Sequence, residues 1–463
     1  MNKFFATTPI YYVNDVPHIG HTYTTIAADV LTRYHHQKGK EAQLLTGTDE
    51  HGAKIAEAAK KHGEKPKEYA DKISQEFKKT WDKLNINYVR FIRTTDEDHI
   101  KIVQEFLLKM YKNGAVEEKP RLYKGLYCVP HEKFMSKDEL VNGLCPDHKT
   151  APIDYAEENY YFRLSDYQQK LEQLISEDKI KVRPLTRKNE VLGKIRQGLE
   201  DISISRANLE WGIPLPFDTS HTTYVWIDAL INYYTYGSAN DLWPADLHLV
   251  GKDILWFHSV IWPAMLLSIG EEPPKEVFAH GFFTINGEKM SKTIGNVIKP
   301  EELINKYGVD GTRYVLLAAF PFGEDGNFSW ELFDRLYNAD LANGLGNLVA
   351  RVARLSEKSG LSINQDMGEH ETKDFEEKIE SLDFSGALVV ANHYLKNIDE
   401  KISQEKPWEI KDKDKLQKLL TSYISEIVKT VKLFQPFLPQ TAENILSQFS
   451  GSIKSAPPLF PRV

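Results

Sequence analysis

Two histidines that flank a glycine form the first candidate site. His18-Ile19-Gly20-His21 follows an apolar segment at 3–13 and opens a predicted helix that ends near Gly39. Residues three apart share a helix face, and glycine lets a ligand approach the backbone. The free N–H groups of a helix N-terminus suit a phosphate. The pattern predicts a cradle for a nucleoside triphosphate, although two capping or surface histidines would give the same four letters.

A lysine tract farther along the chain suits the same chemistry. Lys289-Met290-Ser291-Lys292-Thr293 follows a predicted strand and a glycine-containing loop. Two lysines on a loop next to a glycine can close over phosphates as point charges. A mobile loop would let them act mainly as charge develops in the transition state. The alternative is a solvated lysine loop without a ligand.

The two cysteines of the chain each begin a Cys-x₂-His pair. Cys128 pairs with His131 and Cys145 with His148, and thirteen residues separate the two pairs. Four ligands of these types predict a closed, tetrahedral and structural Zn²⁺ site. The alternatives are a single disulfide, or two unrelated cysteines with chance histidines nearby.

The elements that must position these residues follow from the apolar pattern. Residues 3–13 read as a strand, residues 18–39 as a helix and residues 42–45 as a second strand. Strand, helix, strand is the opening of a doubly wound α/β domain. Residues 54–115 look mostly helical, and residues 116–217 look like short strands and turns.

Strand-like runs return after residue 217, at 224–227, 247–250 and 276–278. One nucleotide-binding domain with a long insertion is the simplest account, and two consecutive α/β domains are the alternative. From Trp330 onward the pattern is helical, and 360–375 is a polar loop. Two apolar stripes predict the core of a helical bundle: Phe333, Tyr337, Leu341, Leu345, Leu348, Val352 and Leu355, then Leu416, Leu419, Tyr423, Ile427, Val431 and Phe434.

Composition excludes some classes of protein. The 463 residues are 41% hydrophobic and 27% charged, which is ordinary for a soluble globular protein. The net charge of −8 argues against indiscriminate coating of nucleic acid, but it allows a local basic face. The longest apolar run, 264–269, is far too short to cross a membrane, and the N-terminus lacks the pattern of a signal peptide. We therefore expect a cytoplasmic protein without a membrane segment.

The histidine and lysine motifs, in this order, resemble the signature of class I aminoacyl-tRNA synthetases. Further segments resemble methionyl-tRNA synthetases in particular, from residue 4 to about 355 and more loosely to Val463. The segments that carry this resemblance are Thr7–Asn14, Gly47–Gly52, Ile202–Arg206, Trp211–Pro214, Tyr224–Ala229, Gly251–Ile254, Phe257–His258 and Gly346–Leu348.

The resemblance implies a fold and a set of boundaries. We expect an α/β fold: a Rossmann-type doubly wound parallel sheet with an inserted zinc-knuckle connective domain, followed by an α-helical bundle that binds the anticodon. The expected segments are the first catalytic half at 1–115, the insertion at 116–217, the second catalytic half at 218–295, a stem-contact region at 296–335 and the helical domain at 336–463.

It also implies a reaction in which methionine attacks the α-phosphate of ATP and the adenylate then reacts with a tRNA 3′ hydroxyl. Mg²⁺ is expected with ATP. By similarity, His18, His21, Lys289 and Lys292 act on the phosphates. The residues expected around ATP are Gly20, Asp49, Glu50, His51, Arg206, Met290 and Ser291. Those expected around methionine are Ile10, Trp226, Tyr233, Asp253, Phe257 and His258, although Trp226 and Phe257 would pass for core aromatics.

The helical end is expected to bind initiator and elongator methionine tRNA. Asn347 and Arg351 match positions that read the anticodon, and they lie four apart on one helix face. An ordinary solvated face is the alternative. The tryptophan that stacks on the anticodon in the family is not evident near Phe449, and Trp408 lies in a different context. The chain ends at Val463 without the domain that dimerises some relatives, which favours a monomer.

Other readings stay open. Relatives that activate valine, leucine or isoleucine carry a larger editing insertion, and those that activate cysteine hold zinc in the amino-acid site. A small-molecule adenylyltransferase could share the histidine motif but would lack the helical domain. A tRNA-binding paralogue without activity would not need intact histidines and lysines.

Overall fold

The computed structural model describes residues 3–129, 133–146, 149–285, 287–290, 295–364, 367–368 and 372–463. The chain divides into two compact units, and both are discontinuous in sequence. Unit 1 comprises residues 1–16, 40–79 and 88–279. Unit 2 comprises residues 17–39, 80–87 and 280–463.

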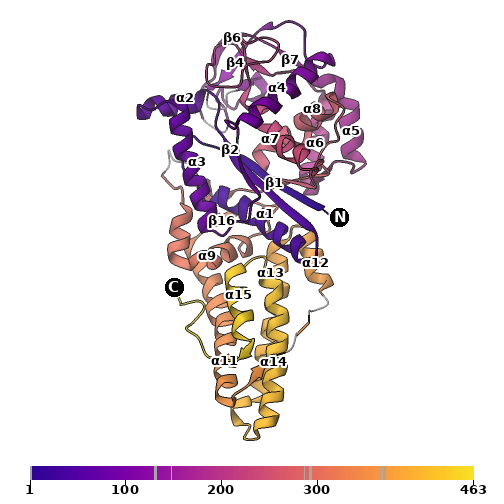
Figure 1. The fold of residues 1–463 in the computed structure, drawn as a ribbon. Helices are drawn as coiled ribbons and strands as arrows, with labels where there is room; N and C mark the ends of the chain where they lie inside the picture. Colours follow the sequence, from indigo (N-terminus) through magenta and orange to yellow (C-terminus); the bar gives the residue numbers. More distant parts are fainter. Residues whose placement is uncertain are drawn as a thin grey trace. The chain divides into compact units, whose positions relative to one another are not determined.

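A six-stranded sheet organises unit 1, in the order β3-β2-β1-β12-β13-β8. Its neighbouring strands β1 and β2 are labelled in Figure 1. The pairs β3–β2, β2–β1, β1–β12 and β13–β8 are parallel. Seven of the ten residues of β1 are buried, as expected for a parallel strand that is covered on both faces. The bounds are β1 Lys3–Tyr12, β2 Glu41–Asp49, β3 Arg90–Arg93, β8 Lys181–Arg183, β12 Leu247–Gly251 and β13 Glu276–His280.

The sheet confirms the predicted α/β fold with a parallel sheet. Strands from before residue 115 and after residue 217 are neighbours in it, because β12 lies directly beside β1. One sheet is therefore interrupted, rather than two domains following each other. The strand order reverses between β1 and β12, and ligands of doubly wound folds bind outside the carboxyl ends of the strands at such a point.

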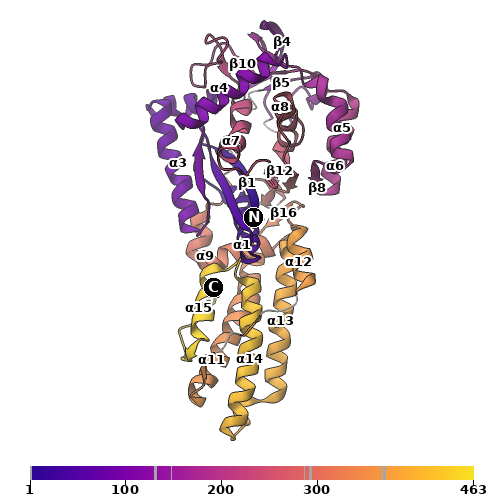
Figure 2. The ribbon, with the colours of Figure 1, turned by 45° about the vertical axis from the view of Figure 1, so that its right-hand side comes forward.

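Helices flank this sheet, and Figure 2 shows α3 on one side of β1 and β12 and the pair α5 and α6 on the other. The hydrophobic core of unit 1 includes Phe106, Leu230 and Trp262. The helices are α2 Ala53–His62, α3 Pro66–Lys83, α4 Glu97–Lys112, α5 Gln168–Ser176, α6 Leu185–Gln197, α7 Val225–Ala239 and α8 Trp262–Ser268.

Two sequence expectations for unit 1 are wrong. Residues 224–227 do not form a strand, because Val225 begins the long helix α7. Most of α7 is buried, and an apolar run of four residues looks the same in a buried helix and in a buried strand. The region 116–217 holds more than short strands, since it contains α5 and α6 and also supplies β8 to the edge of the main sheet.

The same region carries small sheets of its own. Strands β4 Arg121–Cys128, β5 Lys133–Met135 and β6 Ile153–Asn159 form an antiparallel sheet in the order β5-β4-β6. Pairs of two-residue strands lie elsewhere in unit 1: β7 Tyr161–Phe162 with β9 Ile202–Ser203, and β10 Ser205–Arg206 with β11 Thr222–Thr223.

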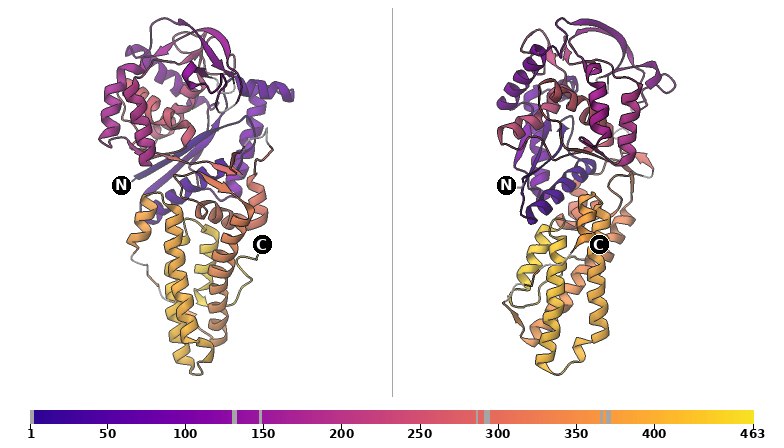
Figure 3. Two further views of the ribbon diagram at one scale, coloured as in Figure 1. Left: turned by 180° about the vertical axis from the view of Figure 1, so that it is seen from behind. Right: turned by 90° about the vertical axis from the view of Figure 1, so that its right-hand side faces the viewer.

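Unit 2 is mainly helical, as predicted from Trp330 onward. The helices α11, α13 and α14 run alongside one another in the orange and yellow part of the chain (Figure 3). The bounds are α1 Ile19–Gln37, α9 Pro300–Ala318, α10 Trp330–Leu336, α11 Asn347–Ser359, α12 Lys373–Glu380, α13 Phe384–Glu405, α14 Lys413–Phe434 and α15 Pro439–Gln448, with short strands β14 Phe283–Ile285, β15 Glu288–Lys289, β16 Gly326–Phe328, β17 Ser362–Ile363 and β18 Gly451–Ser452.

The apolar stripes lie in the core of this unit with one adjustment. The first stripe is buried as far as Val352. In α14 the side chains of Leu416 and Leu419 are only half-buried, and Leu420 and Ile424 are buried instead. The buried face of α14 is thus rotated by about one residue from the predicted one at its N-terminal end.

A buried ion pair ties the helix that starts at the histidine motif to the rest of unit 2. Arg313 of α9 donates to the Oδ2 atom of Asp29 in α1 at 2.6 Å, and both side chains are fully buried. Its other N–H groups donate to the carbonyls of Phe437 at 2.8 Å, Pro436 at 2.9 Å and Leu84 at 3.3 Å. Every strongly polar group of this cluster is therefore satisfied without water, as buried charges require.

Candidate active site

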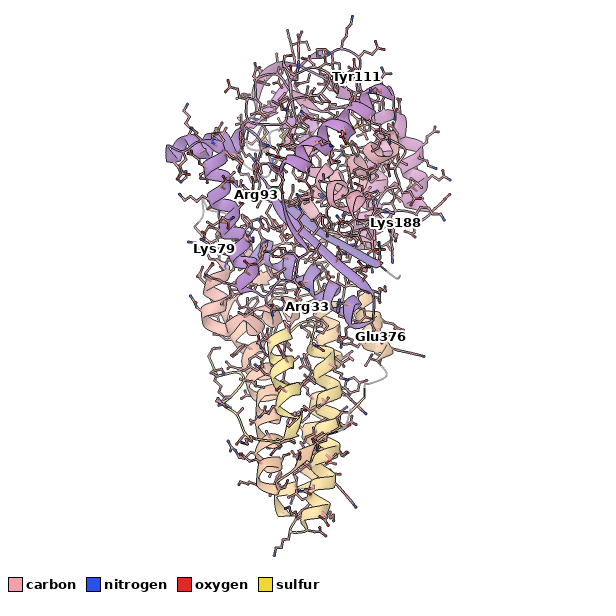
Figure 4. The ribbon with its side chains drawn as sticks, viewed as in Figure 1. Arg33, Lys79, Arg93, Tyr111, Lys188 and Glu376 are labelled. Carbon is pink, nitrogen blue, oxygen red and sulfur yellow. The ribbon has the colours of Figure 1, made fainter. Side chains whose placement is uncertain are left out.

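Polar residues gather where β2 and β3 end, at the carboxyl edge of the sheet in unit 1. The carboxylate of Glu50 is buried and accepts hydrogen bonds from the Nε and Nη2 atoms of Arg93 at 2.7 and 2.8 Å. The hydroxyls of Thr48 and Thr95 donate to it at 2.7 and 2.6 Å. Arg93, labelled in Figure 4, also reaches Asp71 of α3 at 2.5 Å. These four donors occupy the carboxylate, so Glu50 holds the strand ends together and its side chain is poorly placed to take a ligand.

His51, the next residue, belongs to a second buried network. Its Nδ1 lies 2.7 Å from Oδ2 of Asp228, the acidic residue in the first turn of α7. The other carboxylate oxygen, Oδ1, lies 2.8 Å from Nε2 of His99 in α4. Burial alone would raise the pKa of Asp228, but the two histidines hold it below its ordinary value. His99 is fully buried and was not among the residues singled out from the sequence.

The aromatic residues expected around methionine come together in the same unit. The rings of Trp226 in α7 and Phe257 stack with centroids 4.1 Å apart and an angle of 13°. Tyr233, about two helical turns along α7 from Trp226, has its hydroxyl 2.8 Å from Nε2 of His258. A soft thioether is well matched to aromatic walls of this kind.

Hydrogen bonds fix the tautomer of His258. Its Nδ1 lies 2.9 Å from the carbonyl of Ile254 and must donate to it, so Nε2 accepts from the Tyr233 hydroxyl. Burial lowers the pKa of His258 to about 4 and raises the pKa of Tyr233. Both groups are therefore neutral near pH 7. Phe257 and His258 lie in a short π-helix, Phe257–Ile261, a distortion that recurs at functional sites.

Two carboxylates differ in how they relate to this aromatic group. Asp49, at the end of β2, is only 8% exposed, and its charge adds to the raised pKa of Tyr233. Asp253 lies on an exposed turn after β12. Ile10, near the end of β1, is half-buried and packs against the apolar core of unit 1. The structure thus brings Asp49 near the expected methionine residues, although the sequence suggested a place beside ATP.

Arg206 is held in place by its own surroundings in unit 1. Its guanidinium lies 4.0 Å from the ring centroid of Tyr224. Nη1 donates to the hydroxyl of Ser203 at 3.0 Å and to the carbonyl of Ser205 at 2.7 Å. The side chain is nearly buried, so it is oriented before any ligand binds.

The histidine motif lies in unit 2, at the first turn of α1. His18 caps the helix, since its Nδ1 accepts from the N–H of Gly20 at 3.1 Å. Nδ1 of His21 accepts from the N–H of His18 at 3.3 Å. In a neutral ring whose Nδ1 accepts, Nε2 carries the proton. Both rings therefore present an N–H donor, which suits a phosphate oxygen, and they stack with centroids 3.8 Å apart.

Gly20 has a steric reason to be glycine. A Cβ atom there would stand 2.9 Å from Cε1 of His18 and 3.7 Å from Cε of Met290. Met290 of the lysine tract therefore approaches the histidine motif within unit 2. Lys289 belongs to β15, where its backbone pairs with Thr284 of β14. Ser291 and Lys292 lie outside the described residues.

The two residues expected to read the anticodon lie at one end of α11. Asn347 is exposed, and Arg351 forms an ion pair with Asp399 of α13. The π-helical stretch Tyr337–Gly346 ends directly before Asn347. Phe449, near which the family tryptophan is expected, is only 2% exposed and is unable to stack on a base. Trp408, by contrast, is 53% exposed in the turn Pro407–Glu409 between α13 and α14.

The two cysteines lie close together on the β5-β4-β6 side of unit 1. Cys128 and Cys145 are almost fully buried, and they share a small cluster with Met135. His131 and His148 lie outside the described residues. Within the described ranges, no three histidine, cysteine or acidic side chains gather as a metal site. Likewise, no described helix has the length and apolar character needed to cross a membrane.

The strand order, the helix cap built from His18 and His21 and the helical bundle define a class I tRNA synthetase. The profile of the family described as tRNA synthetases class I (M) matches residues 4–154 and 148–353. A methionine–tRNA ligase of Clostridium acetobutylicum is 43% identical over 97% of this chain and 73% of its own length. One of Thermotoga maritima is 41% identical over 97% of this chain and 75% of its own length.

Solved structures agree with these relatives. A Mycobacterium tuberculosis methionyl-tRNA synthetase in complex with methionyl-adenylate is 34% identical, with a TM-score of 0.92 over 99% of both chains. Its apo form is 31% identical, with a TM-score of 0.85 over 100% of this chain and 98% of that one. The chain belongs to the methionyl-tRNA synthetase family.

Proposed function

We propose that this chain is a methionine–tRNA ligase, which activates L-methionine with ATP and transfers it to the 3′ end of methionine tRNA. The observation that carries the proposal is the stacked pair Trp226–Phe257 beside the hydrogen-bonded pair Tyr233–His258 in a doubly wound α/β unit. Apolar aromatic walls and neutral polar groups suit an uncharged thioether side chain. The relatives that share most of the chain are named for the same reaction.

Activation is a displacement at phosphorus that needs no protein nucleophile. The methionine carboxylate forms a bond to the α-phosphorus of ATP, and the bond to pyrophosphate breaks. The protein must hold the two reactants and stabilise the negative charge that moves onto the leaving group. His18 and His21 would donate N–H groups to the phosphates, and Lys289 and Lys292 would balance the charge of pyrophosphate. Mg²⁺ would enter bound to ATP.

Charge and burial suggest which residues would bind the methionine ammonium group and the nucleotide. Asp49 is a buried carboxylate near Tyr233 and suits the methionine ammonium group, and Asp253 is the exposed alternative. Arg206 is oriented to act on the nucleotide. The segments 1–115 and 218–295 would form the catalytic part, 116–217 the connective insertion, 296–335 the stem contact and 336–463 the anticodon-binding part, with the whole acting as a cytoplasmic monomer.

The anticodon would be read by Asn347, Arg351 and Trp408. Splayed anticodon bases are recognised by hydrogen bonds to their edges and by stacking on aromatic rings. Asn347 and Trp408 are exposed enough for those two contacts. Arg351 is already oriented by Asp399.

A structural Zn²⁺ would be held by Cys128, His131, Cys145 and His148. Two buried cysteines in one small cluster fit such a site, since cysteine sulfur is a preferred ligand of structural zinc. Zinc would supply folding energy to the insertion and no chemistry to the reaction. Metal analysis of purified protein and of the Cys145→Ser variant tests this point: about one zinc per chain, lost in the variant, is expected from the four-ligand site.

ATP–pyrophosphate exchange with each of the twenty amino acids, without tRNA, tests the function. Exchange that depends on methionine alone is the expected result. Exchange with another amino acid would keep the class and overturn the pocket. Complete absence of exchange from folded protein would favour a silent tRNA-binding protein or an adenylyltransferase with another acceptor. Lys292→Ala should reduce the exchange rate far more than methionine binding, because Lys292 acts on developing charge; equal losses would refute its role.

A further inference from the structure

A chain of four buried side chains leads from α7 to His51. It runs from Thr235 to His99, then to Asp228 and finally to His51, with heavy-atom distances of 3.0, 2.8 and 2.7 Å. All four residues belong to unit 1, and each is at most 5% exposed. Neither the reaction outlined above nor the sequence motifs account for His99, Asp228 or Thr235.

The hydrogen atoms of this chain follow from its far end. The hydroxyl of Thr235 has one hydrogen and lies 3.1 Å from the carbonyl of Ile231, which can only accept. The hydroxyl therefore donates there and accepts from Nδ1 of His99 at 3.0 Å. Nε2 of His99 faces a carboxylate oxygen at 2.8 Å and must donate as well. The pattern that makes every contact a hydrogen bond thus places protons on both nitrogens of His99.

A cationic His99 balances the buried charge of Asp228. A buried carboxylate needs one cationic partner and hydrogen bonds to its other oxygen. The structure provides both, since His99 contacts Oδ1 and His51 contacts Oδ2. The nearby Glu50 has its own cation in Arg93. His51 is therefore not required to carry a charge, and it donates through Nδ1 as a neutral ring.

We propose that Asp228, His99 and Thr235 are positioning residues that hold His51 as a neutral imidazole, whose Nε2 accepts a hydrogen bond from a donor group of a substrate. This inference rests on the proposed function and on the expected place of His51 around ATP. Among the described residues, nothing is hydrogen-bonded to Nε2 of His51. The ring of Trp211 packs edge-on against it, with centroids 5.2 Å apart, and the indole N–H is fixed on the carbonyl of Glu50 at 2.6 Å.

This role is opposite to that of the histidines in α1. His18 and His21, as neutral rings whose Nδ1 accepts, carry their protons on Nε2 and suit phosphate oxygens. By contrast, the unprotonated Nε2 of a neutral His51 repels a phosphate and attracts a hydroxyl, amino or ammonium group. Such donors exist on the ribose and adenine of ATP and on the ammonium of methionine. The network therefore assigns His51 to a donor group and excludes it from the triphosphate.

Nitrogen NMR of the wild-type protein tests the proton pattern directly and without reference to activity. The protein is labelled in its 15 histidines, and His51→Gln and His99→Gln identify the two resonance sets. We expect His99 to be protonated on both nitrogens and His51 on Nδ1 alone. A neutral His99, or a proton on Nε2 of His51, would overturn the proposal even if methionine-dependent exchange is confirmed.

A matched pair of variants then tests the role. Thr235→Val removes the acceptor of the Nδ1 proton with little change in volume, and Thr235→Ser keeps the hydroxyl. The valine variant should lose the doubly protonated signal of His99 and raise the KM for ATP or for methionine about tenfold, as expected for loss of one hydrogen bond of about 1.4 kcal/mol. The substrate whose KM rises carries the donor, and Thr235→Ser should behave like wild type.

A histidine outside this network provides the control variant. His221→Gln alters another buried histidine of unit 1 that pairs with a different carboxylate, Asp218, and should leave both KM values unchanged. If Thr235→Val folds and changes kcat and both KM values no more than His221→Gln does, the positioning role is refuted. Inactive wild-type protein with the expected NMR pattern would instead point to failure of the proposed function.

Discussion

Replacing Arg313 with methionine removes a buried guanidinium while keeping most of the apolar stem. Asp29 would keep the Nε of Arg33 at 2.8 Å and the N–H of Asn87 at 2.8 Å, so its charge would be only partly compensated. Arg33 is labelled in Figure 4. Breaking a buried ion pair by removing one partner costs about 3–5 kcal/mol. Three backbone carbonyls would also lose a donor, at about 1 kcal/mol each before relaxation.

We therefore expect Arg313→Met to lower the free energy of unfolding by about 4 kcal/mol, because the remaining partners of Asp29 offset part of the sum. The assay is equilibrium urea unfolding, with hydrogen exchange of the α1 amides to locate the loss in unit 2. Lys396→Met is the control, since Lys396 pairs with Glu400 at 3.8 Å on an exposed face. A surface pair of this kind contributes at most about 1 kcal/mol. Equal losses in the two variants, or unchanged protection of α1, would refute the reasoning.

Three further predictions concern pH, the anticodon end and a close backbone contact. Burial lowers the pKa of both His258 and His280 to about 4, whereas the unfolded chain has the ordinary pKa of about 6.5. The unfolded chain therefore binds more protons below about pH 6.5, and the free energy of unfolding decreases as the pH is lowered. Each histidine should contribute about 2 kcal/mol of the loss between pH 7 and pH 5 in urea unfolding, and His280→Gln should reduce that loss. Trp408→Ala should lower kcat/KM for tRNA charging by the equivalent of about 1–3 kcal/mol and spare ATP–pyrophosphate exchange, whereas unchanged charging would exclude stacking. Phe449→Ala, by contrast, should lower stability. In Gly47→Ala the new Cβ would stand 1.8 Å from the carbonyl oxygen of Ile92 and should destabilise the β2–β3 edge in thermal unfolding, while Gly193→Ala in α6, which meets open space, should be neutral or slightly stabilising.

The parts of the fold that could be predicted have a periodic pattern or a local signal. β1 and α1 show this, because a buried strand and a capped helix are each specified by adjacent residues. The stretch 224–227 was misjudged because apolar residues of α7 are buried nearly all round, which removes the periodic signal. The short strands β3 and β8 carry too few residues for a pattern, and only the neighbouring strands define them.

The residues of the candidate site also divide into those with a local sequence signal and those without one. His18 and His21 could be found because the motif and its helix are contiguous in the sequence. His99 had no local signal, since its partner Asp228 is 129 positions away and pairing needs the packing of α4 on α7. Trp408 carries a local signal of exposure, because a tryptophan after a proline, in a polar segment between two helical stretches, is seldom buried. Phe449 is the opposite case: it follows the last helix, where an aromatic residue is often buried, and its side chain is buried here.

The interleaving of the two units in the sequence has a consequence for the growing chain on the ribosome. Helix α1 is translated early, yet 232 residues of unit 1 (40–79 and 88–279) emerge between Gly39 and the long segment of unit 2 that starts at His280. Until α9 is made, Asp29 lacks its partner Arg313, and α1 lacks the helix that it contacts in unit 2. Nascent chains arrested before residue 300 should therefore hold α1 open to chaperones and proteases, even when the sheet of unit 1 has already formed.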